Sequence, residues 1–308
     1  LISYVCKLNQ SGEYIWSNKI DAKNNNWILS VATDHSGHVY SSGMFIGNTD
    51  FDPGADTFSL QSGPCIDIFI LKLDANGNFK WVKQLESPYV PDLISMDIDA
   101  KGNIYTTGAF SKSMDFNPSP DEEYILKTSS GNTNNFICKL DTDGNFIWAN
   151  QWIDIKPSWS TLSSKISLDD YENIYLLGSF SGTIDFDPGP GKVQRESMSK
   201  ILRDSLGNAY SEPTEDIFIL KLNSAGELEW AETLGGDQDD NGHFISVDGF
   251  GNLYATGTFG GNLDFDPGAW TYNLKADNNP DIFIIKLQHT TLNLEEATLN
   301  PQLLCYPN

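Results

Sequence analysis

The hydrophobic and polar positions of this chain form short alternating runs that return about every 65 residues. The clearest run is Asp67–Trp81 (DIFILKLDANGNFKW), and related runs begin near residues 4, 135, 216 and 281. The lysines of these runs, spaced by 65, 67, 82 and 65 residues, are Lys7, Lys72, Lys139, Lys221 and Lys286. Because side chains alternate between the two faces of a strand, and because no segment shows a convincing helical pattern, the runs predict strands.

A second recurring segment lies between these runs and predicts hairpins. Its clearest copy is 245–268 (ISVDGFGNLYATGTFGGNLDFDPG), which is matched by 30–54, 95–118 and 166–189. Short β-branched and aromatic runs broken by Gly, Asn and Asp are typical of antiparallel hairpins. The DFDP end of the segment is expected at an edge or in a loop, because proline cannot donate to a central ladder. Asp67–Leu73 is apolar on both faces, which predicts a strand between two sheets.

Together the two segments predict an all-β fold. Each repeat supplies about four strands, and strand-only repeats of this length stack as the blades of a β-propeller. We therefore predict a propeller of four-stranded antiparallel blades, with four full repeats and split terminal strands over residues 1–288. A β-solenoid is the competing architecture, but its turns are usually much shorter. The third repeat carries an insertion, Lys192–Glu215, which we interpret as a surface loop rather than an eroded hairpin.

Composition narrows the class of protein. The 308 residues carry a formal net charge of −23, and 39% are hydrophobic, which is ample for a core. Nucleic acid and anionic membrane surfaces would repel such a chain, so neither is expected as a partner. No apolar run is long enough to span a membrane. We expect Cys6, Cys65, Cys138 and Cys305 to be free thiols, and bridges that involve Cys65 or Cys305 stay open.

The segments 235–240 (GGDQDD) and 246–257 (SVDGFGNLYATG) resemble the SBBP repeat, the so-called seven-bladed β-propeller repeat of exported bacterial proteins. The DFDPG and D-x-F-I-x-K-L-D-x-x-G-N-x-x-W segments accompany that repeat in many such proteins. The resemblance covers roughly residues 4–288 and implies an exported propeller. Four hairpin segments and five K-L strands fall short of the family's blade number. The chain is then either closed with about five blades, pairing its terminal strands, or part of a larger propeller.

The C-terminal segment 303–308 (LLCYPN) is similar to the opening of the sorting domain used by type IX secretion, in which a Y-P-N-P segment begins a small β-sandwich. This resemblance divides residues 289–308 into a linker and the start of a truncated sorting domain. It implies a secreted or cell-surface protein of a Bacteroidota-like bacterium.

The DFDP segments are the strongest candidates for a metal site. Residues i and i+2 of an extended segment face the same way, so each pair presents two oxygen ligands side by side. Calcium takes six to eight oxygens, to which neighbouring carbonyls could contribute. The alternative is a tight turn in which the first Asp caps the loop. The candidate calcium ligands are Asp50, Asp52, Asp115, Asn117, Asp185, Asp187, Asp264 and Asp266.

Other polar and aromatic repeats receive structural interpretations. The D-x-[DN] spacing at Asp74 and Asp141 fits a hairpin turn better than a calcium loop, because the distal Glu is absent. The mid-strand lysines need a buried partner, for which a repeated aspartate is the expected one. Repeated tryptophans at 16, 81, 148 and 230 are expected to pack between blades. The tryptophans outside the repeat register are candidates for stacking on a sugar; these are Trp152, Trp159 and Trp270.

No residue is assigned a catalytic role. The four histidines lack metal-site spacing, and no G-x-S-x-G elbow occurs. We therefore expect a non-enzymatic binding or structural module, stabilised by calcium, whose partner is a protein or glycan at the cell surface or a larger surface assembly. The alternative is a carbohydrate-active enzyme or lectin that uses the propeller's central face. A cluster of non-repeated polar and aromatic side chains on one face would favour that alternative.

Overall fold

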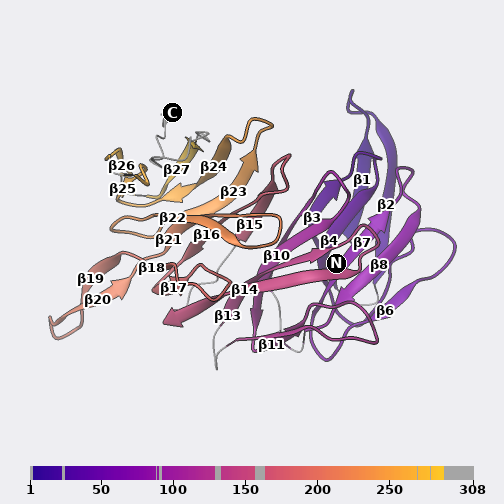
Figure 1. Ribbon diagram of the computed structural model, residues 1–308, viewed down its shortest axis with the longest axis horizontal. Coiled ribbons are helices and arrows are strands. Elements are labelled where there is room, and N and C mark those ends of the chain that lie inside the picture. Colours follow the sequence, from indigo (N-terminus) through magenta and orange to yellow (C-terminus); the bar gives the residue numbers. More distant parts are fainter. Residues whose placement is uncertain are drawn as a thin grey trace. The chain divides into compact units, whose positions relative to one another are not determined.

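The computed structural model describes residues 3–22, 25–87, 89, 92–128, 133–156, 164–268, 270–277 and 279–287. The chain divides into two compact units, Leu1–Gln151 and Trp152–Asn308. Every regular element in the described ranges is a β-strand (Figure 1). These ranges contain no helix, and therefore no helix that is long and apolar enough to cross a membrane. The all-β prediction is confirmed.

The first unit contains antiparallel sheets that follow the repeats. One sheet pairs β1 with β2 and is extended by the hairpin β5–β6, a second has the strand order β3-β4-β7-β8, and β11–β12 is a separate hairpin. A third sheet begins with the order β9-β10-β13-β14; β14 continues past Gln151 into the second unit, where its last residues pair with β17 (Thr183–Asp185). The strands are β1 (Ser3–Leu8), β2 (Tyr14–Ala22), β3 (Asn26–Thr33), β4 (Val39–Phe45), β5 (Asn48–Asp50), β6 (Ser59–Gln61), β7 (Asp67–Leu73), β8 (Phe79–Leu85), β9 (Asp92–Ile98), β10 (Ile104–Ser111), β11 (Ser113–Asp115), β12 (Ile125–Lys127), β13 (Thr133–Leu140) and β14 (Phe146–Lys156).

The second unit continues the repeat. Its sheets have the orders β15-β16-β21-β22 and β23-β24-β27, and its hairpins are β17–β18, β19–β20 and β25–β26. The strands are β15 (Ser164–Leu168), β16 (Ile174–Phe180), β17 (Thr183–Asp185), β18 (Gln194–Glu196), β19 (Ser199–Arg203), β20 (Ala209–Pro213), β21 (Asp216–Leu222), β22 (Leu228–Leu234), β23 (Asn241–Val247), β24 (Leu253–Phe259), β25 (Asn262–Asp264), β26 (Asn273–Lys275) and β27 (Asp281–Leu287).

The inner strands of the four-stranded sheets are buried on both faces. β7 and β21 share the sequence DIFILKL, and all seven positions of each strand are buried. A strand can be buried on both faces only when sheets cover it from both sides. The prediction that Asp67–Leu73 lies between two sheets is therefore confirmed.

The DFDP segments connect each repeat to the outer strand of the preceding sheet. β5 pairs with β2 through Asp21 and Asp50, and β17 pairs with the end of β14 through Ile153 and Asp185. In the second repeat, Asp115 N donates a hydrogen bond to Glu86 O at 3.2 Å. The predicted edge or loop position of this segment is confirmed, because β5–β6 and β17–β18 lengthen a sheet at its margin, whereas β11–β12 and β25–β26 pair as separate hairpins.

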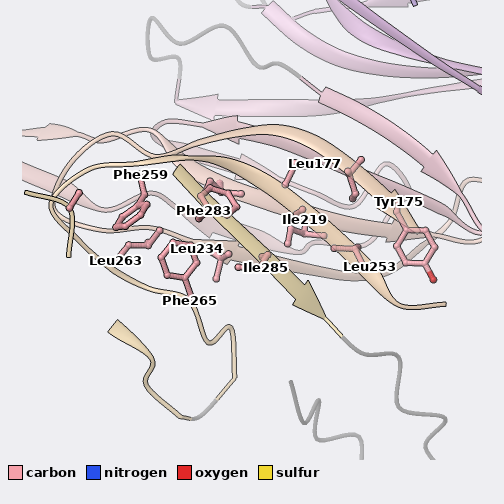
Figure 2. Packing of buried hydrophobic residues seen from close by; sticks show 14 residues of the cluster. Tyr175, Leu177, Ile219, Leu234, Leu253, Phe259, Leu263, Phe265, Phe283 and Ile285 are labelled. Carbon is pink, nitrogen blue, oxygen red and sulfur yellow. The ribbon is translucent and has the colours of Figure 1, made fainter. Parts of the chain in front are cut away.

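Side chains from neighbouring sheets interdigitate to form the core. In the second unit, Tyr175, Leu177 and Ile219 of one sheet pack with Leu253, Phe283 and Ile285 of the next (Figure 2). Equivalent clusters fill the first unit. Each fully buried Leu, Ile or Phe contributes about 1.5–3 kcal/mol of hydrophobic free energy. Packing between sheets is therefore the main stabilising interaction of the repeat.

Two parts of the sequence interpretation have different outcomes. The insertion in the third repeat is not a loop: it contains the hairpin β19–β20, whose strands pair from Ser199 with Pro213 to Arg203 with Ala209. The alternative interpretation, an extra hairpin that resembles the repeated hairpin segment at residues 203–210, is the correct one. The linker and sorting segment predicted for residues 289–308 lie outside the described residues.

Candidate functional site

The predicted metal ligands of the DFDP segments accept hydrogen bonds from the backbone of their own loop. Asp50 Oδ1 accepts one from Asp52 N at 3.1 Å and one from Phe58 N at 2.9 Å. Asp52 Oδ1 accepts one from Gly54 N at 2.7 Å. The other copies repeat this geometry, with Asp115 and Asn117, Asp185 and Asp187, and Asp264 and Asp266 in the same roles.

A calcium ion would require more oxygens than one loop pair supplies. Calcium takes six to eight oxygen ligands, and Oδ1 of both loop side chains already accepts backbone N–H groups. In the described part of the chain, no three or more His, Cys, Asp or Glu side chains are grouped so that they could hold a metal ion. The loop bonds explain these residues as turn acceptors, and calcium binding stays a prediction.

The D-x-x-G-N segments form hairpin turns, as expected. Asp74 Oδ1 accepts hydrogen bonds from Asn76 N at 2.8 Å and Asn78 N at 2.9 Å, and its Oδ2 accepts one from Asn78 Nδ2 at 2.9 Å. Asp141 repeats these bonds. The Asn78 side chain lowers the pKa of Asp74 by stabilising the carboxylate. These carboxylates therefore fix the turn between two strands.

Two of the repeated lysines contact the hairpin turn of the following repeat, whereas Lys221 Nζ pairs with Glu229 Oε2 of its own sheet at 2.8 Å. Lys7 Nζ donates to Ala75 O at 2.9 Å, and Lys72 Nζ donates to Thr142 O at 3.1 Å. Lys72 also lies over the Tyr40 ring, 4.9 Å from its centroid. Burial lowers the pKa of Lys72. The expected partner, a repeated aspartate, was wrong for these two lysines, because a backbone carbonyl and an aromatic ring take its place.

A set of repeated phenylalanines was not identified from the sequence. The central residue of each DFDP segment is fully buried; these residues are Phe51, Phe116, Phe186 and Phe265. Phe51 lies 5.2 Å from Phe45 and 4.9 Å from Phe69, between ring centroids. Four such triads occur, one in each repeat. The signal was present as a Phe at fixed places in the G-x-F, D-F-[DN]-P and N-F-I or D-I-F segments.

The three tryptophans outside the repeat register differ in exposure. Trp152 is only 2% exposed, so its proposed role in stacking on a sugar was wrong. Trp270 is 76% exposed and follows the DFDP segment of the fourth repeat. Trp159 lies outside the described residues. Trp270 is therefore the candidate for sugar stacking that the structure leaves accessible.

The hairpin β19–β20 is the clearest departure from repeat symmetry. Within the described ranges its two strands pair only with each other. Four apolar side chains on the hairpin or just before it are exposed, with Ile201 at 76%, whereas Leu202 is half-buried; the four are Met198, Ile201, Leu206 and Tyr210. A two-stranded hairpin is marginally stable by itself in water. Exposed apolar groups on such an element mark a surface that a partner could cover.

The base of this hairpin is held by polar groups. Met198 N donates to Asp216 Oδ2 at 2.8 Å, and Thr214 Oγ1 donates to Asp216 Oδ1 at 3.0 Å. Lys200 Nζ lies 3.7 Å from Asp239 Oδ2. A hollow of about 370 Å³ lies beside Lys200 and is also lined by Asp237, Gln238, Asp239, Gly260 and Pro280. The hairpin thus has a fixed root and an acidic neighbourhood.

Two carboxyl groups near this root are buried. Burial raises the pKa of Asp216 to about 6 and that of Asp240 to about 7. Asp240 Oδ2 accepts a hydrogen bond from Gly236 N at 2.9 Å, and Oδ1 accepts one from Gly260 N at 3.0 Å. Perturbed carboxyls can act as general acids or bases. Here the two oxygens of Asp240 join the 235–240 loop to the turn between β24 and β25. This is a structural role.

Comparisons with known proteins place few limits on the function. No family model matches the chain. It is similar to an uncharacterized WD repeat-containing protein of Acanthamoeba polyphaga mimivirus, at 24% identity over 272 residues, covering 81% of this chain and 18% of that protein. A crystal structure of a protein of unknown function from Bacteroides caccae matches with a TM-score of 0.39 and 10% identity, over 82% of this chain and 78% of that one. The chain spans about a fifth of the curated relative's length.

Proposed function

We propose that this chain is a non-enzymatic β-propeller or propeller segment that binds another protein through the hairpin β19–β20. The observation that carries the proposal is the exposure of Ile201 on an element that the described residues of the other repeats do not form. The repeated polar residues described above fasten turns and sheets, so the insertion is the natural place for a specific ligand. The WD repeat-containing relative supports a repeat protein of the propeller type. Export to the cell surface rests on the family resemblance alone.

The side chains of the hairpin and of its root indicate which side chains the partner should carry. Ile201 and its apolar neighbours favour apolar side chains, and the carboxylates of Asp237 and Asp239 beside the root favour lysine or arginine. The outer edges of β19 and β20, which pair with no other strand of the described ranges, could also accept an added strand. The partner is therefore a protein segment that combines apolar and basic side chains.

Site-specific photo-crosslinking tests this proposal. A photoreactive residue at position 201 should trap one discrete protein in cells that produce the chain, whereas the same residue at Tyr171, an exposed position on a repeated turn, should not. With the trapped protein purified, Ile201→Asp should weaken binding about tenfold or more, and Tyr171→Asp should leave it unchanged. Equal adducts from both positions, or equal affinities of both variants, would overturn the proposal.

One observation favours a second candidate, a lectin. Trp270 exposes most of its ring two residues before the exposed Tyr272, and sugars stack on such rings. A lectin of this kind would show glycan-dependent quenching of tryptophan fluorescence that Trp270→Ala removes. Unchanged quenching in Trp270→Ala would reject this site.

A further inference from the structure

Neighbouring sheets within each unit pack in one recurring way. One face of each sheet, here called the forward face, carries the repeated Lys and the residues two and four positions before it. The opposite face, here called the backward face, carries the residues one and three positions before that Lys and the one after it. In the first unit, Ile68 and Ile70 of a forward face share a core with Phe136 and Leu140 of the next backward face.

The second unit repeats this interface. Ile217 and Ile219, on the forward face of β21, pack with Phe283 and Ile285, on the backward face of β27 (Figure 2). The interface is thus defined by residue position in the repeat, and within each unit the forward face of one sheet is complementary to the backward face of the next.

Hydrogen bonds fix the alignment of neighbouring sheets. Lys7 Nζ and Trp16 Nε1, from the first sheet, both donate to Ala75 O in a turn of the second. A Cβ at Gly77 in that turn would lie 3.0 Å from the Trp16 ring, and the residue has a φ of +85°. Glycine therefore lets the turn approach the tryptophan closely. The contact is specific as well as apolar.

The last sheet has a forward face that remains open. Ile282 and Ile284 of β27 are 70% and 58% exposed, whereas the equivalent Ile217 and Ile219 of β21 are completely buried. Phe244 of β23, in the same sheet but separated from β27 by β24, is also exposed. Large apolar side chains in a row on a sheet face are typical of an interface.

The first sheet has the complementary open face. Tyr4 and Leu8 of β1 are 70% and 53% exposed, and Cys6 between them is exposed too. The residues at the same repeat positions in β7, Phe69 and Leu73, are buried. The backward face of the first sheet is therefore uncovered, and it has the character of the surfaces that forward faces cover elsewhere in the chain.

We propose that a second copy of this chain occupies these faces, so that the forward face of the last sheet in one copy packs on the backward face of the first sheet in another. The contact would reproduce the interface that each unit already contains. Because the two surfaces differ, the association is head-to-tail, and it can continue into rings or longer assemblies. The proposal does not depend on the hairpin β19–β20.

Charge makes the association sensitive to salt. Each copy carries a net charge of −23, so two copies repel each other at low ionic strength. Salt screens this repulsion and leaves apolar contact largely unaffected. We expect association of the chain to strengthen as sodium chloride is added.

Native mass spectrometry and sedimentation velocity test the arrangement. The wild-type chain should form dimers and larger species with increasing concentration, and Ile284→Asp and Tyr4→Asp should each reduce them. An equimolar mixture of the two variants should form a one-to-one heterodimer, since each variant keeps one intact face. Ile201→Asp, on the insertion hairpin, should associate like the wild type.

Each other outcome excludes the proposal. A wild-type chain that stays monomeric at all concentrations would show that no second copy binds, and a lowered melting temperature of Ile284→Asp would then indicate closure within one chain. Dimers that survive in Ile284→Asp would place the interface elsewhere. A mixture of the two variants that forms no heterodimer would exclude the head-to-tail arrangement.

Discussion

At the scale of single residues, the repeated carboxylates act as hydrogen-bond acceptors, and the position of the acceptor oxygen matters more than its charge. Asn117 stands where the other DFDP segments have Asp, and its Oδ1 accepts the same kind of bond, from Ser119 N at 3.0 Å. Asp52, Asp187 and Asp266 make the equivalent contact with a glycine N–H. An amide oxygen therefore satisfies the loop as well as a carboxylate does.

This argument predicts unequal effects of two substitutions at Asp264. Asp264→Ala removes the acceptor for Asp266 N and Tyr272 N and should lower the free energy of unfolding by about 1–2 kcal/mol. Asp264→Asn retains an oxygen and should cost much less. Urea unfolding in EDTA measures both.

The same variants separate turn chemistry from calcium binding. If the loops bind calcium, the wild type should melt several degrees higher in calcium than in EDTA, through mass action. Asp264→Asn should then lose this increase. Turn chemistry alone predicts equal melting temperatures in both buffers.

Burial of Asp240 predicts a distinct pH dependence. Its pKa of about 7 in the folded state lies above the ordinary value of about 4, so the folded state holds this proton more tightly than the unfolded state. The stability that this group contributes is complete below about pH 4 and is lost as the pH rises through about 7. As the pH rises from about 4 to about 7, the unfolding free energy of the wild type should therefore fall relative to that of Asp240→Asn. A gap that is constant from pH 4 to 8 would show that Asp240 titrates normally.

At the scale of elements, each DFDP hairpin is anchored by its phenylalanine. Phe265 is fully buried and packs against Phe259 and Phe283 at centroid distances of 5.1 and 5.2 Å. The segment is therefore a margin of the sheet that inserts one ring into the core. The sequence pattern drew attention to the aspartates of the segment, although burial of the phenylalanine ring contributes more to its stability.

Phe265→Ala should accordingly destabilise the protein by about 3–5 kcal/mol, the usual range for removal of a buried aromatic ring. Phe250→Ala, at an 89% exposed turn position, is the matched control and should change stability little. Denaturant unfolding of the two variants compares them. Similar stabilities would contradict the anchoring role.

The sequence was sufficient for the strands and hairpins, because a two-residue period and Asp-Gly or Asn-Gly turns are local signals. The contact between Lys72 and Thr142 could not be read in this way, since 70 residues separate the partners. The insertion hairpin was missed because its strands are mostly exposed, so their sequence lacks the regular alternation of apolar and polar residues that marks a strand with one buried face. Burial of Asp240 depends on loops from both ends of one repeat, which no spacing reveals.

At the scale of the whole molecule, repetition and its interruption have different roles. Buried strands such as β7 and β21 occur in equivalent places and hold the sheets together. The hairpin β19–β20 has no counterpart among the described residues; β20 is exposed throughout and β19 at alternate positions. We infer that the repeated positions determine stability and association between copies of the chain, and that the interruption determines which other protein is bound.

Hydrogen–deuterium exchange of the free protein tests this division most directly. The account predicts that amides of β7 and β21 exchange slowest, and that those of β19 and β20 exchange about a hundredfold faster or more, because the hairpin opens without disrupting the stacked sheets. Exchange in β19 and β20 as slow as in β21 would show that the hairpin belongs to the stable core, and would contradict the account.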